Sequence, residues 1–167
     1  MILGMSTSTF TLVHVLLSLA GIGSGFIVVF GLLSRRNLNG WTAIFLSTTI
    51  LTSVTGFLFP LHGVTPGIIL GVLSLIVLAA TIAARYAFHL SGAWRSTYVI
   101  SAIIALYFNC FVAIVQSFEK VPALHELAPN GKEPPFLAAQ LLLLVLFVVL
   151  GVLSVKKFKL GTASAHA

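Results

Sequence analysis

Long apolar stretches alternate with short polar breaks along the whole chain. Each stretch has about 18–24 residues, the length that an α-helix needs to cross a hydrocarbon core about 30 Å thick. Runs such as LLLLVLFVVL at 141–150 have no period of two, which argues against transmembrane β-strands. The pattern therefore predicts an all-α integral membrane bundle of five transmembrane helices. They cover residues 10–33, 41–59, 67–84, 97–117 and 136–155.

Composition supports a membrane protein and limits its domain count. Of the 167 residues, 59% are hydrophobic and only 7% are charged, whereas soluble domains carry about 25% charged residues. A water-soluble fold is thereby excluded, and the five spans leave no room for a separate catalytic domain. We expect a single transmembrane domain at 1–160 and a short tail at 161–167.

The charged residues predict the orientation of the bundle. Because basic residues concentrate on the cytoplasmic side of membrane proteins, their positions place the N-terminus outside and the C-terminus inside. The net charge of +6 is thus an orientation signal and does not indicate nucleic-acid binding. The bases predicted on the inner side are Arg35, Arg36, Arg85, Arg95, Lys156, Lys157 and Lys159; those predicted outside, together with the acids, are Lys120, Lys132, Glu119, Glu126 and Glu133.

Polar side chains within four of the apolar stretches fall at similar depth, in the outer half of the membrane. In lipid such groups usually face the interior of a bundle, and helical spacing places several of them on common faces. The sequence therefore predicts an outward-opening polar pocket, with the outer connection at 118–135 as its lid. The expected ligand-binding residues are His14, Ser18, Thr52, Thr55, Asn109, Gln116 and Gln140.

Each of these polar residues also has a purely structural interpretation. Hydroxyl groups in membrane helices commonly bond the carbonyl four residues earlier, and amides can join neighbouring helices. His14 can serve as a polar anchor that reaches the membrane interface. The pattern alone leaves both interpretations open.

Motifs for specific chemistry are missing from the sequence. No H-x-x-x-H, H-E-x-x-H or C-x-x-C pair is present, so the sequence predicts no cofactor and leaves metal binding undecided; the outer-loop candidates are His62, His125 and Glu126. Cys110 is single and is assigned to packing.

With no catalytic residue to name, the expected function is an accessory subunit or a small-molecule binding or transport component. The alternative is a redox protein that binds b-type haem or quinone near the outer surface through His14.

The segment at 14–25, HVLLSLAGIGSG, resembles small bacterial multispan membrane proteins that carry a histidine near the outer end of the first helix. The likeness covers a dozen residues and implies no catalytic residue. The expected location is the bacterial cytoplasmic (inner) membrane. The lipid bilayer is the expected partner, and a second copy of the chain or a larger membrane complex are further candidates.

Overall fold

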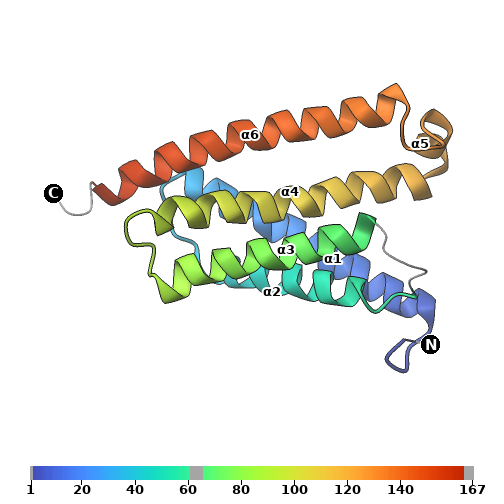
Figure 1. Ribbon diagram of the computed structural model, residues 1–167, viewed down its shortest axis with the longest axis horizontal. Helices are drawn as coiled ribbons and strands as arrows, with labels where there is room; N and C mark the ends of the chain where they lie inside the picture. Colours follow the sequence, from blue (N-terminus) through green and yellow to red (C-terminus); the bar gives the residue numbers. More distant parts are fainter. Residues whose placement is uncertain (1, 61–65, 164–167) are drawn as a thin grey trace.

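A computed structural model describes residues 2–60 and 66–163 of the chain. Within these residues the fold is all-α and contains no β-strand, which confirms the all-helical part of the prediction. Successive long helices run in alternate directions (Figure 1). The elements are α1 (Thr7–Leu33), α2 (Asn39–Gly56), α3 (Pro66–Ile82), the π-helical turn η1 (Ala83–Ala87), α4 (Trp94–Lys120), α5 (Pro122–Leu127) and α6 (Pro134–Ala163).

Local capping groups fix the two ends of α1. The Ser6 hydroxyl accepts a hydrogen bond from the Thr9 backbone N–H and starts α1 before the apolar run. At the other end of α1, Arg35 adopts a left-handed φ of 59°. The Arg36 N–H then bonds the Gly31 carbonyl at 2.8 Å, which closes the helix.

Four helices in the described part of the chain are long and apolar enough to cross a membrane: α1, α3 continued through η1 (Pro66–Ala87), α4, and α6 as far as Phe158. The fifth predicted span corresponds to α2, which has 18 residues. Its hydroxyl side chains lower its hydropathy, so α2 is not among the four. The chain thus has the character of an integral membrane protein.

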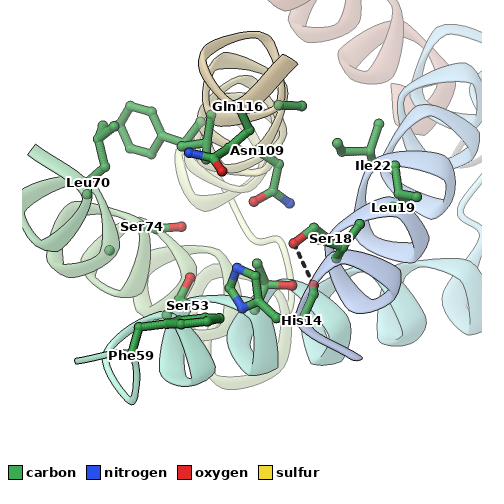
Figure 2. A pocket seen from close by; sticks show the side chains of 18 of the residues that line it. His14, Ser18, Leu19, Ile22, Ser53, Phe59, Leu70, Ser74, Asn109 and Gln116 are labelled. Carbon is green, nitrogen blue, oxygen red and sulfur yellow. Dashed lines mark hydrogen bonds between the residues drawn. The ribbon is translucent and has the colours of Figure 1, made fainter. Parts of the chain in front are cut away.

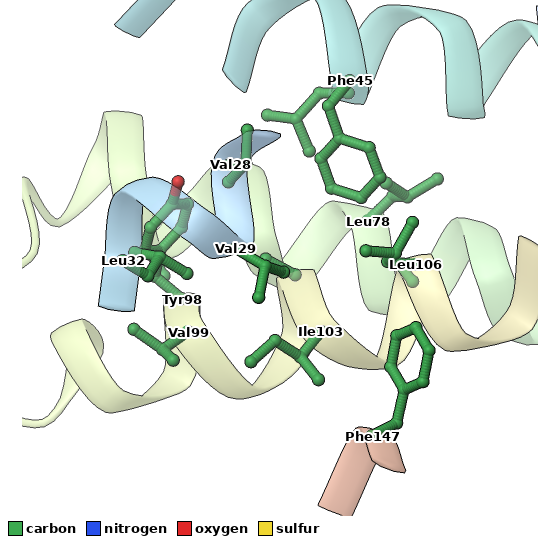
Figure 3. Packing of buried hydrophobic residues seen from close by; sticks show 14 of the residues in the cluster. Val28, Val29, Leu32, Phe45, Leu78, Tyr98, Val99, Ile103, Leu106 and Phe147 are labelled. Carbon is green, nitrogen blue, oxygen red and sulfur yellow. The ribbon is translucent and has the colours of Figure 1, made fainter. Parts of the chain in front are cut away.

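Helix α4 lies at the centre of the bundle. It contacts α3 and α1 on one side and α6 on the other, while α2 packs against α1 and α3 (Figure 1). The buried core is made largely of aliphatic and aromatic side chains (Figure 3). Large apolar side chains such as Phe30 and Leu142 are about 70% exposed, as expected for surfaces that face lipid. The core includes Val28, Val29, Leu32, Phe45, Leu78, Tyr98, Val99, Ile103, Leu106 and Phe147.

The two ends of the bundle differ in charge. What we call the basic end carries Arg35, Arg36, Arg85, Arg95, Lys156 and Lys157, next to the end of α1, the start of α2, η1, the start of α4 and the last turns of α6. The acidic end carries Glu119, Glu126 and Glu133, next to the end of α4, α5 and the start of α6.

One basic residue of the orientation signal, Arg85, is buried rather than exposed. Its Nη2 donates hydrogen bonds to the side-chain oxygens of Asn37, at 2.9 Å, and Asn39. Its guanidinium carbon lies 5.1 Å from the centre of the Tyr98 ring, within the range of a cation–π contact. Arg85 therefore joins the turn between α1 and α2 to η1 and α4.

The connection at the acidic end is partly helical and tightly turned. α5 follows α4 directly, and the Glu133 carboxylate then accepts hydrogen bonds from the Lys132 N–H at 2.9 Å and the Asn130 amide at 2.8 Å. These bonds, that of the Lys132 N–H above all, lower the pKa of the Glu133 carboxyl to about 2. At neutral pH the turn that leads into α6 is therefore held by an ionised carboxylate.

Candidate pocket between four helices

A pocket of about 620 Å³ lies between α1, α2, α3 and α4 in the half of the bundle nearer the acidic end. Most of its wall is hydrocarbon, and a few polar groups point into it. The side chains of His14, Asn109, Gln116 and Ser74 converge on this space from α1, α4 and α3 (Figure 2). A largely apolar cavity with a few convergent polar groups is typical of small-molecule sites.

Hydrogen bonding determines which nitrogen of His14 is available to a ligand. Its Nδ1 lies 2.8 Å from the Thr55 hydroxyl oxygen. Thr55 uses its only hydroxyl proton within its own helix, on the Leu51 carbonyl at 2.7 Å, so it accepts from the Nδ1–H of His14. In the neutral ring Nε2 is then an acceptor. It has no hydrogen-bond partner among the described residues.

The side-chain amides of Asn109 and Gln116 on α4 use their N–H groups in hydrogen bonds but not their carbonyl oxygens. The Asn109 Nδ2 donates to the Thr49 hydroxyl at 3.1 Å and links α4 to α2. The Gln116 Nε2 donates to the Glu119 carboxylate at 2.9 Å. The carbonyl oxygens of both amides have no partner within the described residues. Together with His14 Nε2, they give the pocket three acceptor groups.

The hydroxyl groups around the pocket divide into two kinds. Ser18 donates to the His14 carbonyl at 2.8 Å, and Ser53 donates to the Thr49 carbonyl at 3.0 Å, as the structural interpretation of such residues expects. Thr52 and Ser74 have buried hydroxyl oxygens without a hydrogen-bond partner in the described part of the chain. These two hydroxyls therefore remain unused and shielded from solvent at the pocket wall.

Five of the seven predicted ligand-binding residues line the pocket: His14, Ser18, Thr52, Asn109 and Gln116. Thr55 does not line it but holds the His14 ring from behind. Gln140 is placed elsewhere: its Nε2 donates to the Phe111 carbonyl at 3.3 Å and joins α6 to α4. A helix that is apolar on all sides carries no periodic signal that says which face meets a neighbour, so the direction of Gln140 could not be predicted.

The outer-connection candidates do not reach the pocket in the structure. His125 and Glu126 are exposed on α5, and neither lines it. Only Lys120 and Val121 of the connection at 118–135 border the pocket, so α5 does not form the expected lid. His62 lies outside the described residues.

Several lining residues were not among the predicted ones. Phe57 and Phe59 follow α2, and the His14 ring meets the Phe59 ring edge-on with centroids 5.3 Å apart. Gly71 and Ser74 come from α3. Gly71 lies close to α2, since an added Cβ would be 2.8 Å from the Phe57 ring, whereas Ser74 turns its hydroxyl to the pocket wall (Figure 2).

No group of three or more histidine, cysteine, aspartate or glutamate side chains gathers into a metal site among the described residues. Cys110 is buried in the core and does not line the pocket. Of the described histidines, only His14 lines the pocket. The available chemistry is therefore hydrogen bonding by neutral groups, with the Lys120 ammonium at the rim.

Comparisons with protein-family models, with curated proteins and with solved structures found no match for this chain.

Proposed function

We propose that this protein spans the membrane and binds a small, mostly apolar molecule in the pocket, as an accessory subunit or as a binding or transport component. The observation that carries the proposal is the set of three unused acceptors, His14 Nε2 and the side-chain oxygens of Asn109 and Gln116, in an otherwise apolar wall. All three acceptors are half-buried and face the pocket without a partner among the described residues, so a ligand that supplies O–H or N–H donors would gain hydrogen bonds here.

The topology that suits this function has five spans, with the N-terminus outside and the C-terminus in the cytoplasm of a bacterial cell. In support, α2 packs along α1 and buries Thr42 and Thr49. Several of its other hydroxyls bond carbonyls of their own helix, which reduces the cost of placing them in lipid. The described bases at the basic end have no carboxylate side chain near them in sequence. An excess of lysine and arginine is typical of the cytoplasmic side of membrane proteins.

Reporter fusions test this topology. We expect alkaline phosphatase fused after Lys120 to be active, because the acidic end is external, and the same enzyme fused after Arg36 or Ala167 to be inactive. A fluorescent reporter that folds only in the cytoplasm should give the opposite pattern. Activity of the phosphatase at Ala167 would overturn the orientation, and equal results after Arg36 and Lys120 would overturn the number of spans.

A second candidate is a hydroquinone, which the same acceptors favour. The two hydroxyls of a hydroquinone are donors at opposite ends of an apolar ring, whereas the oxidised quinone offers acceptors only. His14 Nε2 on α1 and the amide oxygens on α4 face the pocket from different helices. A ring with a hydroxyl at each end needs acceptors on two sides in this way. For b-type haem, His14 is the one histidine that the described wall supplies, which leaves a second axial nitrogen without a source.

The binding proposal is tested with an alkyl hydroquinone and its dimethyl ether, which keeps the ring and the alkyl chain and replaces both O–H donors with methoxy groups. In detergent micelles we expect the hydroquinone to bind the wild type about tenfold more tightly than the ether, because one or two hydrogen bonds are lost. His14→Ala and Asn109→Ala should each lower the affinity for the hydroquinone and leave that for the ether unchanged.

Leu16→Ala is the matched control, since Leu16 lies on α1, is 57% exposed and does not line the pocket. If His14→Ala and Asn109→Ala lower only the amount of folded protein, as Leu16→Ala would not, these residues join helices and do not bind a ligand. A Soret band in the absorption spectrum of the purified protein would show bound haem, and haem would then take the place of hydroquinone as the second candidate.

A further inference from the structure

A second cavity lies at the other end of the molecule, on the surface where α1 and α6 separate. It is a groove of about 550 Å³ that is open along its length and lined only by apolar side chains. Phe26 and Phe147 meet at its inner limit, with ring centroids 6.1 Å apart. Its walls are Phe26, Ile27, Val29, Phe30, Leu33, Leu146 and Leu150.

Basic side chains stand where this groove reaches the end of the bundle. Arg35 and Arg36 come two and three residues after Leu33, just past the end of α1. On α6, Lys157 lies seven residues after Leu150, which places it on the same face of the helix and about 10 Å further along the axis. Arg35, Arg36 and Lys157 are all exposed. The acidic side chains of the chain lie at the opposite end.

We infer that this groove is a binding site for an anionic phospholipid of the leaflet at the basic end. One acyl chain lies in the apolar groove, and the phosphate group meets Arg35, Arg36 and Lys157. An apolar slot that ends in cations, without a carboxylate to neutralise them, complements a molecule with a hydrocarbon chain and a negative head. This site is separate from the pocket and does not depend on what the pocket binds.

A second copy of the chain is a poorer occupant for the same surface. A symmetric pair that shared this groove would bring two sets of Arg35, Arg36 and Lys157 together, and like charges at an interface oppose association. A phospholipid meets the same surface with opposite charge.

Native mass spectrometry of the detergent-solubilised full chain tests the site. Phosphatidylglycerol and phosphatidylcholine with identical acyl chains separate the headgroup from the chain, and glycerophosphoglycerol supplies the phosphodiester without acyl chains. We expect the wild type to retain phosphatidylglycerol at least about tenfold more strongly than phosphatidylcholine, since the choline cation offsets the phosphate charge and is repelled by the bases, whereas phosphatidylglycerol keeps a net negative charge. Glycerophosphoglycerol should not be retained.

Two pairs of variants locate the binding. Arg36→Gln with Lys157→Gln should reduce retention of phosphatidylglycerol about tenfold, whereas Lys120→Gln with Lys132→Gln removes the same charge from the acidic end and should leave retention unchanged. Leu150→Trp fills the groove and should also reduce it. Val152→Trp, on the same helix but outside the groove, should not.

The proposal is overturned by equal losses in the two charge variants, or by equal losses in the two tryptophan variants. It is also overturned by equal retention of the two lipids, by retention of glycerophosphoglycerol at the same strength, or by a lipid-free dimer that Leu150→Trp abolishes.

Discussion

Gly25→Val is expected to lower the free energy of unfolding by about 3 kcal/mol, near the upper end of the usual cost of overpacking a core. A Cβ at Gly25 would lie 2.5 Å from Leu106 Cδ1 and 3.0 Å from two carbons of the Phe45 ring. Both neighbours are themselves almost fully buried, so neither can move aside freely. Valine at this position must therefore force α1 away from α2 and α4.

Gly23→Val is the matched control for this effect. It lies on the same helix and changes the helix propensity equally, but a Cβ there has nothing within 4 Å. Stability is measured by unfolding in a denaturing detergent. Leu106→Ala should restore part of the loss in Gly25→Val, because it empties the space that the valine needs. If Gly23→Val is as damaging as Gly25→Val, the close approach of the helices is not the cause.

The second large effect is expected at Tyr98, which is 1% exposed at the basic end of α4. Tyr98→Ala should lower the free energy of unfolding by about 3–5 kcal/mol, as large aromatic truncations in cores do. The loss has two parts: the vacated core volume, and the ring face over which the buried Arg85 guanidinium lies at 5.1 Å.

Tyr98→Phe separates the ring from the hydroxyl. The hydroxyl makes one long hydrogen bond, 3.3 Å to Thr42, so its removal should cost no more than about 1 kcal/mol. The same detergent unfolding assay measures both variants. If Tyr98→Phe is as unstable as Tyr98→Ala, the hydroxyl and not the ring supports this end of the bundle.

The apolar stretches located the long helices because hydrophobicity over a membrane-spanning length depends only on local sequence. The ends of the helices were harder to predict. α1 starts at Thr7 because of the Ser6 cap, and α6 continues beyond the predicted end at residue 155 into a charged segment. Neither extension changes the hydropathy pattern much.

Part of the pocket could be predicted, because the depth of a polar residue in the membrane follows from its position along a helix. Which of them meet depends on how each helix is rotated about its axis, and that rotation arises from packing such as Gly25 against Leu106 and Phe45. His14 and Asn109 both line the pocket, while Gln140 lies outside it. The burial of Arg85 could not be predicted, because its asparagine and tyrosine partners come from separate turns and helices.

The short length of α2 has a consequence for the surrounding lipid. Its 18 residues span about 27 Å, whereas the 27 residues of α1 and of α4 span about 40 Å. In the five-span topology proposed above, a bilayer cannot match both lengths at once, so tilt of the long helices and local thinning of the membrane beside α2 are the expected response. Such hydrophobic mismatch would make the bundle sensitive to bilayer thickness, and the flank formed by α2 is where lipids with shorter chains would gather.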